Sequence, residues 1–214
     1  MVDVPVDQLT GVVDGARARA RGQLLDAGLE LFGVYGYAQT SKQALCDMAG
    51  VPVEVLWEEF GSREGLLTAL HNQITTAGLR AAEVALLSEG MDDCPMAQRF
   101  RRLFDAYVSA VTRDLREARV TFVEVLGVSP AVDAHCKRWR DLWTDFLTGE
   151  AERAAVRGEA EERDHRVVVM VMVGTVHELM AHHARRPRRA RPDEVSEELT
   201  RLGLEMLGAA PRTE

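Results

Sequence analysis

Residues 40–67, TSKQALCDMAGVPVEVLWEEFGSREGLL, carry the pattern that decides the fold. Thr40 with Gln43 three residues later fits a capping box, so the spacing predicts a short helix that begins at the next residue. Gly50 can adopt the positive φ that ends such a helix, and Pro52 suits the first turn of a second one. Two short helices joined by a tight turn indicate a helix-turn-helix motif.

The apolar residues of this stretch follow the helical period, so each short helix has one inward face. The inward positions are Ala44, Leu45, Met48, Ala49, Val53, Leu56, Trp57 and Phe60. Gly61 is expected to end the second helix, and Ser62 to cap a longer third one. A preceding helix, from about Ala18 to Tyr35, supplies the apolar surface on which the pair packs.

Length and composition favour an all-α fold with about nine helices. The chain has 214 residues, 46% of them hydrophobic, which is enough to form a sizeable core in one or two domains. No alternating strand pattern bounded by turn signals occurs. The remaining helices are expected at about 96–114, 115–127, 131–157, 165–185 and 192–208.

The composition divides the chain into three predicted regions. Residues 1–16 are polar and contain two glycines, which predicts a flexible arm. Residues 17–62 form the helix-turn-helix domain, and residues 63–210 form a larger helical body. The segment 89–95, rich in Gly, Asp and Pro, predicts a loop near the start of that body.

The helix-turn-helix stretch resembles the DNA-binding domain of the TetR/AcrR family of bacterial transcriptional regulators, over roughly residues 20–70. The residues that carry the resemblance are Leu24, Ala27, Leu31, Phe32, Gly36, Tyr37, Thr40, Leu45, Ala49, Gly50, Val51, Leu56, Phe60, Ser62, Arg63, Glu64, Leu66 and Leu67. The resemblance implies an all-helical homodimer with a DNA-binding head and a body that holds a small ligand.

The second short helix departs from the family pattern on its outward side. Pro52, Glu54 and Val55 stand where the family usually has small residues. The usual Tyr-x-Tyr-Phe is replaced by the segment 57–60, Trp-Glu-Glu-Phe. A tyrosine that touches DNA phosphate in the family is thus replaced by a carboxylate.

The resemblance places a set of motif residues against DNA. They are Thr40, Lys42, Gln43, Val53, Glu54, Trp57, Glu58 and Arg63. Lys42 and Arg63 are expected to contact phosphates. Gln43 can pair with adenine, whereas Glu54 or Glu58 can accept a hydrogen bond from cytosine.

Charge argues against strong DNA binding and keeps a second interpretation open. The formal net charge is −8, which repels nucleic acid at long range. Within the motif, Lys42 and Arg63 face the acidic residues Asp47, Glu54, Glu58, Glu59 and Glu64. The alternative is a TetR-like ligand-sensing or protein-binding dimer whose acidic recognition helix no longer reads DNA.

Three arginines before the motif, Arg17, Arg19 and Arg21, allow two interpretations. A basic arm can reach phosphates or the minor groove, and the family places this arm near DNA. Arginines that flank a helix start are more often simply solvated charge.

Aromatic side chains on several body helices predict either core packing or a cavity for a small apolar effector. The predicted ligand-binding residues are Phe100, Phe104, Tyr107, Phe122, Trp139, Trp143 and His177. Polar groups considered for the same cavity are Glu124, His135 and Arg140. No cofactor is expected.

The last two predicted helices indicate a homodimer. The helix at 165–185 is apolar nearly all round, and with the helix at 192–208 it can form a four-helix bundle across a two-fold axis. The longest apolar run, Val167 to Val176, is too short to span a bilayer, and the N-terminus lacks a secretory signal. We therefore expect a cytoplasmic protein without membrane contact.

Catalytic and metal-binding motifs are absent from the sequence. His177-Glu178 followed by His182 fails the zinc-protease spacing because position 181 is Ala. No phosphate-binding glycine loop or nucleophile elbow occurs, and three scattered cysteines suggest neither disulfides nor zinc. A helical enzyme is the weakest of three interpretations. The sequence predicts a repressor, released from a palindromic operator by a small apolar ligand.

Overall fold

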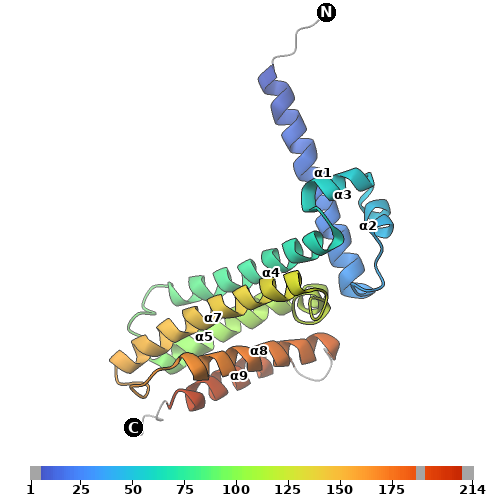
Figure 1. Ribbon diagram of the computed structural model, residues 1–214. Coiled ribbons are helices and arrows are strands. Elements are labelled where there is room, and N and C mark those ends of the chain that lie inside the picture. The colour runs from blue at the N-terminus through green and yellow to red at the C-terminus, as the bar shows by residue number, and fades with distance from the viewer. Residues whose placement is uncertain (1–5, 187–190, 209–214) are drawn as a thin grey trace, which may run out of the picture.

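The computed structural model describes residues 6–186 and 191–208 (Figure 1). Within these ranges it contains nine α-helices and one π-helix, and no strand. The predicted all-α class is therefore confirmed. Residues 1–5 of the predicted arm and 209–210 of the predicted body lie outside the described part of the chain.

The N-terminal part, here called the head, consists of three helices and the first turns of a fourth. These are α1 (Val6–Val34), α2 (Lys42–Ala49), α3 (Val53–Phe60) and α4 (Arg63–Leu86). Figure 1 shows α2 and α3 beside the C-terminal half of α1, whose N-terminal half projects away from the rest of the molecule. The head has the predicted helix-turn-helix arrangement.

The first helix is longer than predicted, because it begins at Val6 and not at Ala18. The flexible arm predicted for residues 1–16 is therefore wrong for residues 6–16. Its two glycines led to that prediction, but a glycine inside a helix costs only about 1 kcal/mol relative to alanine. Such a cost does not end a helix whose other residues favour it.

The cap of α2 also differs from the prediction. Ser41 is the N-cap, and its hydroxyl accepts a hydrogen bond from the backbone N–H of Ala44 at 3.0 Å. The Thr40 side chain instead donates to the carbonyl of Gly36 at 2.8 Å, so the capping box with Gln43 is wrong. Gly50 ends α2 at φ 66°, as expected, and Pro52 caps α3 and is not part of its first turn.

The body is built from the rest of α4 and six further elements. They are α5 (Met96–Thr112), α6 (Leu115–Arg119), the π-helix η1 (Val120–Glu124), α7 (Pro130–Val156), α8 (Arg166–Arg185) and α9 (Pro192–Met206). α5 packs against α4 on one side and α9 on the other, while α8 packs against α7. The predicted helix at 115–127 is divided into α6 and η1.

Two hydrophobic clusters stabilise the two parts of the chain, and α4 contributes to both. Leu66, Leu67 and Leu70 near its start belong to the head cluster, whereas Ala82 and Leu86 near its end belong to the body cluster. The head cluster also takes in side chains from η1, α7 and the segment between them, namely Val120, Val125, Val132 and Cys136. The domain boundary proposed at residues 62 and 63 therefore falls inside a continuous core.

Helices α1 and α6 approach closely at a glycine. A Cβ atom on Gly33 would lie 2.5 Å from Cβ of Arg116, so only glycine permits this packing. Arg116 Nη1 also donates to Glu30 at 2.5 Å, which holds the same two helices together. The head and the body are thus fixed to each other by packing and by charge.

A buried ion pair joins α5 to α7 inside the body. Arg99 donates through Nε and Nη2 to Oε2 of Glu150 at 3.0 and 2.8 Å, and through Nη1 to the carbonyl of Met91 at 2.6 Å. Both side chains of the pair are about 5% exposed. Arg153 also contacts Glu150.

Removing one member of this pair is predicted to destabilise the protein strongly. Glu150→Gln leaves the buried Arg99 charge with only the fully exposed Asp92, 3.7 Å away, as a counter-charge, which costs about 3–5 kcal/mol of unfolding free energy. The double variant Arg99→Met/Glu150→Leu removes both charges and is expected to recover most of that loss. Urea unfolding followed by circular dichroism measures both; a double variant less stable than Glu150→Gln would contradict the prediction.

Candidate DNA-binding face and ligand cavity

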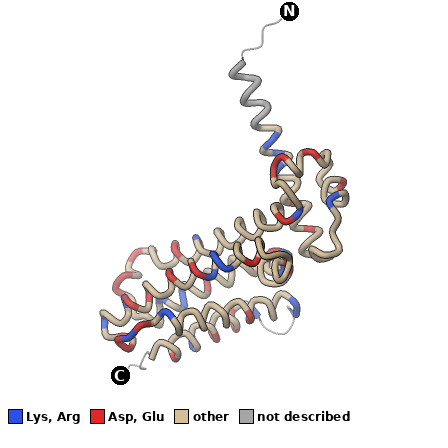
Figure 2. Tube along the Cα trace, viewed as in Figure 1, with Lys and Arg blue, Asp and Glu red and all other residues tan. Residues whose placement is uncertain are grey.

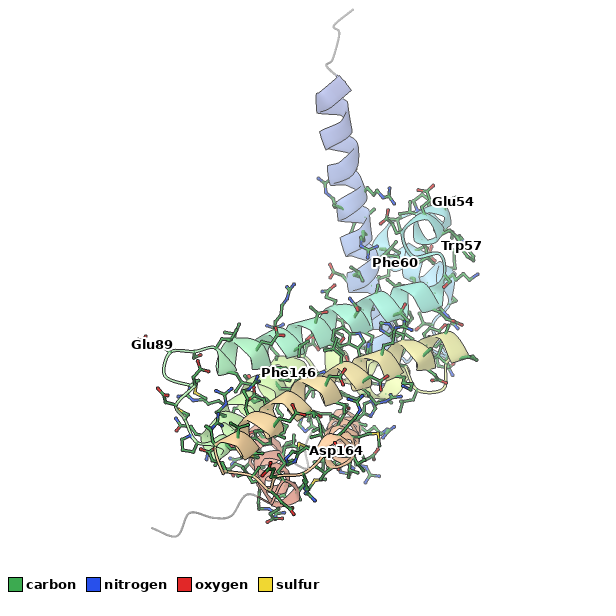
Figure 3. The ribbon with its side chains drawn as sticks, turned by 60° about the vertical axis from the view of Figure 1, so that its left-hand side comes forward. Glu54, Trp57, Phe60, Glu89, Phe146 and Asp164 are labelled. Atoms are coloured by element: carbon green, nitrogen blue, oxygen red, sulfur yellow. The ribbon has the colours of Figure 1, made fainter. Side chains whose placement is uncertain are left out.

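The outward face of α3 carries Glu54, Trp57 and Glu58, all exposed. Trp57 is 49% exposed, so it is not a core residue as its helical position had suggested. Figure 3 shows Glu54 and Trp57 on the outer surface of the head, away from the body. Val53, at the start of α3, is half-buried.

Helix α2 adds polar side chains to the same face. The ammonium group of Lys42 lies 4.5 Å from the centroid of the Trp57 ring, a cation–π contact that joins the two helices. Gln43 donates to Asp47 at 2.7 Å, one turn further along α2. Five of the predicted DNA-contacting residues are thus exposed on α2 and α3, namely Lys42, Gln43, Glu54, Trp57 and Glu58.

Two other predicted DNA contacts serve the scaffold. Thr40 is 3% exposed and its hydroxyl is hydrogen-bonded inside the head, so this residue is not available to DNA. The Arg63 guanidinium lies 4.1 Å from the centroid of the Tyr37 ring and donates to the carbonyl of Thr40. Arg63 remains half-buried and borders a surface hollow that Lys42 and Tyr37 also line.

Glu59 does not belong to the outward acidic face. Its side chain is 6% exposed and forms ion pairs with Arg17 and Arg21 of α1. The Arg21 guanidinium also lies 4.5 Å from the ring centroid of Phe60. Two of the three arginines expected to form a basic arm therefore hold α1 against α3, and Figure 2 shows how acidic and basic residues alternate through the head.

The body contains a partly open cavity of about 60 Å³ between α4, α5, η1, α7 and α8. Six of the seven predicted ligand-binding residues line it: Phe104, Tyr107, Phe122, Trp139, Trp143 and His177. Phe100 does not, and that prediction is wrong. Phe100 packs against Phe104 and against Gly203 of α9 on the far side of α5.

The polar lining of the cavity was only partly predicted. Arg140 and His177 line it, whereas Glu124 and His135, also considered for it, do not. Sequence reasoning missed further lining residues, namely His71, Thr75, Leu103, Thr121, Cys136, Leu147, Val173 and Val176. His71 and Thr75 lie on the buried side of α4, where the helical period beginning at Leu67 would have indicated them.

His71 is a buried imidazole whose two nitrogens both face protein groups. Its Nδ1 lies 3.1 Å from Nε2 of His135, and its Nε2 lies 3.9 Å from the Cys136 sulfur. Burial, helped by the nearby His135, His177 and Arg140, lowers the pKa of His71 to about 3. Burial and Arg140 also lower the pKa of His177. These imidazoles are therefore neutral at physiological pH.

The π-helix η1 connects the cavity to the head. Thr121 and Phe122 line the cavity, and Glu124 at the end of the same element accepts a hydrogen bond from the backbone N–H of Tyr37 at 2.8 Å. Arg119 donates to Glu124 at 2.8 Å and to the carbonyl of Val34 at 3.0 Å. A change in the cavity wall therefore has a direct route to the end of α1.

Helix α8 presents an unpartnered apolar face. Val167, Met170 and Val171 are 66%, 58% and 52% exposed and lie on one side of the helix. Gly174 continues that side, and a Cβ added there would meet nothing within 4 Å. By length and composition α8 is the one described helix that could cross a membrane, but its opposite side packs against α7, η1 and α9.

Helix α9 is arranged differently from the prediction. In the predicted helix 192–208, Val195, Leu199 and Leu207 are buried within the protomer, where α9 packs on α5, so they are not available to a second subunit. Among the described residues, no three His, Cys, Asp or Glu side chains are placed to hold a metal ion.

The buried state of His71 predicts a pH dependence of stability. The unfolded chain binds a proton at this residue below about pH 6.5, whereas the folded chain does so only near pH 3. Stability is thus complete above pH 6.5 and falls as the pH decreases through that window. His71→Gln should lose about 2 kcal/mol of the difference in unfolding free energy between pH 7 and pH 5.

Urea unfolding at the two pH values measures this difference at fixed protein concentration. His182→Gln, at an exposed position on α8, is the matched control and should behave as the parent protein. An unchanged pH dependence in His71→Gln would show that this imidazole is already protonated in the folded state.

Comparison with known proteins places this geometry in context. Residues 24–70 match the profile of bacterial regulatory proteins of the tetR family. The HTH-type transcriptional activator FasR of Mycolicibacterium smegmatis is 30% identical over 134 residues, which cover 61% of this chain. The matched region spans 58% of that relative's length.

Solved structures share the whole fold at low sequence identity. FadR, a fatty acid degradation regulator of Bacillus halodurans, has a TM-score of 0.77 at 16% identity, over 89% of this chain and 97% of its own. FadR of Bacillus subtilis, in complex with stearoyl-CoA, has a TM-score of 0.73 at 18% identity, over 86% and 97%. A tetR-family protein of Rhodococcus RHA1 has a TM-score of 0.71 at 22% identity, over 90% and 98%. Residues 24–70 thus match the DNA-binding domain of bacterial regulatory proteins of the tetR family, and the solved structures share the fold of nearly the whole chain.

Proposed function

We propose that the protein is a homodimeric transcriptional repressor that binds a palindromic operator and releases it when a small apolar ligand enters the body. The observation that carries the proposal is the position of η1. Its Thr121 and Phe122 line the cavity, while its Glu124 is hydrogen-bonded to the head. A ligand that displaces η1 therefore changes where the head lies relative to the body.

The mechanism is a population shift between two arrangements of the head. A ligand favours release only if it binds more tightly to the arrangement with low DNA affinity. In a dimer, two recognition helices must reach successive major grooves about 34 Å apart. Displacing each head through η1 and α4 changes that separation and weakens both contacts together.

The proposed DNA-contacting residues are those left exposed around the turn between α2 and α3. Lys42 and the half-buried Arg63 border one hollow and suit phosphate contacts. Gln43 and Glu54 are exposed and can read base edges, and Trp57 offers a flat apolar surface beside them. Val53 and Glu58 complete the proposed set, from which Thr40 is excluded by burial.

The relatives suggest an acyl chain as the apolar ligand. The Bacillus halodurans protein is a fatty acid degradation regulator, and the Bacillus subtilis protein was solved with stearoyl-CoA. The cavity volume of about 60 Å³ leaves room for ordered water but is small for an acyl chain. A long chain would thus require the surrounding helices to separate, which is the movement that the mechanism needs.

The apolar face of α8 supports dimerisation. Val167, Met170, Val171 and Gly174 form a surface on which a second α8 can pack closely. We propose that α9 contributes to the interface only with exposed side chains, because its buried apolar side chains pack within the protomer. We place the protein in the cytoplasm, where its operator lies.

A charge introduced on this face is predicted to separate the subunits. Val171→Arg puts an unpaired charge into the proposed interface, and charges that are buried without a partner are strongly unfavourable. Val156→Arg on α7 is the control, because Val156 is 89% exposed and lies outside that face. Sedimentation velocity should show dimers for the parent and for Val156→Arg and monomers for Val171→Arg; a dimeric Val171→Arg variant would place the interface elsewhere.

A second candidate function rests on the acidic surface of α3. Glu54 and Glu58 are exposed beside the proposed reading residues. Carboxylates repel the phosphate backbone, so this face also suits a dimer that senses a ligand or binds a basic protein without reading DNA. Glu59, which had strengthened this alternative, no longer does so because Arg17 and Arg21 neutralise it.

Variants that remove a positive or a negative charge from the face formed by α2 and α3 distinguish DNA binding from the second candidate function. An operator is first selected from random oligonucleotides, and its affinity is then measured by fluorescence anisotropy over a range of salt. Lys42→Ala should weaken binding and reduce the slope of log K against log salt by about 0.9 for each phosphate that the protein no longer neutralises. Glu54→Gln/Glu58→Gln should strengthen binding, because it removes two charges that repel phosphate while each glutamine can still hydrogen-bond to a base edge. Lys137→Ala on α7 is the control for removal of an exposed lysine and should change neither the affinity nor the slope.

If neither the parent nor the Glu54→Gln/Glu58→Gln variant selects any DNA sequence, the repressor function is wrong and the second candidate stands. If the parent binds DNA but Lys42→Ala changes neither the affinity nor the salt slope, the assigned face is wrong.

A further inference from the structure

The wall of the body cavity is chemically asymmetric. Its lining includes the apolar side chains of Leu103, Phe104, Leu147 and Val173 and a polar group, here called the polar end, of Arg140, His177, Thr121 and His71. Arg140 lies close enough to His71 and His177 to lower the pKa of both. On α7 both kinds of lining residue occur along one helix, since Arg140 lies one turn after Cys136 and two turns before Leu147. No aspartate or glutamate is among the lining residues.

Three polar side chains at this end have unused hydrogen-bonding capacity. Thr121 is 2% exposed and its hydroxyl oxygen has no hydrogen-bond partner. Within residues 6–186 and 191–208, the side chains of Arg140 and His177 have no hydrogen-bond or ion-pair partner either. Thr121 is the buried member of this set, whereas Arg140 and His177 are half-buried; a buried polar group without a partner costs about 1–3 kcal/mol, so a ligand or ordered water that bonds to Thr121 would be favourable.

His71 lines the polar end of the cavity, but its ring nitrogens are not free to bind a ligand. Both of its ring nitrogens are directed at protein groups, His135 and Cys136. Arg140 is close enough to His71 and His177 to affect the titration of both. The local field is therefore positive, and the histidines remain neutral beside a permanently charged guanidinium.

The charged groups around His177 do not cancel this field. Glu178, next to it in sequence and exposed, acts in the direction that raises the pKa of His177, but burial and Arg140 are the larger effects and lower it. Glu124, the nearest acidic residue of η1, is already bonded to Arg119 and to the backbone of Tyr37. Arg185 at the end of α8 adds further positive charge.

We propose that the effector is an amphiphile with a free carboxylate, bound with its head at Arg140, His177 and Thr121 and its apolar chain toward Leu103 and Leu147. Guanidinium and carboxylate match in charge and in planar geometry, and His177 and Thr121 can each donate one more hydrogen bond. This inference rests on the proposed function and specifies its ligand. It favours a free fatty acid over a thioester, whose carbonyl carries no charge.

The placement gives the carboxylate a role in signalling. It would contact α7, α8 and η1 at once, because Arg140, His177 and Thr121 come from these three elements. Thr121 lies three residues before Glu124, the residue that accepts the hydrogen bond from Tyr37. Binding of the head group would therefore act on the element that holds the DNA-binding head.

The test measures binding of four probes with the same eight-carbon chain by isothermal titration calorimetry: octanoate, 1-octanol, octylamine and octanoyl-CoA. The parent protein should bind octanoate most tightly. Arg140→Met, which keeps an apolar stem, should weaken octanoate binding about tenfold or more, because charge-assisted hydrogen bonds are the strongest ones. Its effect on 1-octanol should stay within about twofold.

Further variants separate folding from recognition. Arg138→Met removes a neighbouring exposed arginine of α7 and should leave all four affinities unchanged. Arg140→Lys should restore part of the octanoate affinity, and Thr121→Val, an isosteric change, should weaken octanoate alone. Equal binding of octanoate and 1-octanol by the parent, or full octanoate affinity in Arg140→Met, would overturn the inference.

Operator affinity is also measured in the presence of each probe. This measurement shows whether a negative result contradicts the carboxylate site or the ligand-controlled release of the operator. Octanoate that binds through Arg140 but leaves operator affinity unchanged would uphold the carboxylate site and contradict ligand-controlled release. Release of the operator by octanoyl-CoA or 1-octanol, independent of Arg140, would uphold the proposed function and overturn the carboxylate site.

Discussion

The carboxylate of Glu124 holds together the two halves of the molecule. It accepts hydrogen bonds from the backbone of Tyr37 and from Arg119, which in turn donates to the carbonyl at the end of α1. These contacts join groups more than eighty residues apart, since Tyr37 and Glu124 differ by 87 positions. Because the last carbonyls of a helix have no partners within it, the Arg119 guanidinium, which donates to the carbonyl of Val34, also completes the end of α1.

The π-helix makes this junction responsive to the cavity. A π-helix is rarer than an α-helix and is found mostly at functional sites, because it inserts an extra residue into the helical turn and redirects side chains. Here it directs Thr121 and Phe122 into the cavity and Glu124 toward the head. The residues of η1 that line the cavity and the one that contacts the head are therefore only a few positions apart.

The cavity of the body and the outward face of the head carry charges of opposite sign. In the body, a cavity without acidic lining residues keeps Arg140 beside neutral histidines, so an anion is the complementary guest. In the head, the acidic side chains are partly neutralised: Glu59 is held by Arg17 and Arg21, and the exposed Glu54 and Glu58 remain. A DNA-binding face that retains two carboxylates would bind most sequences poorly, which favours specific over non-specific association.

The sequence by itself determined the all-α class, the helix-turn-helix and most of the aromatic cavity lining, because these depend on local period, on caps and on glycine or proline positions. It did not determine what a polar side chain contacts at long range. Thr40 is turned inward, Glu59 is paired with α1, and Phe100 packs on α9. The sequence also could not place His71 beside Cys136, 65 positions away. Only tertiary packing brings such groups together, and it decides whether a charge faces solvent, DNA or a ligand.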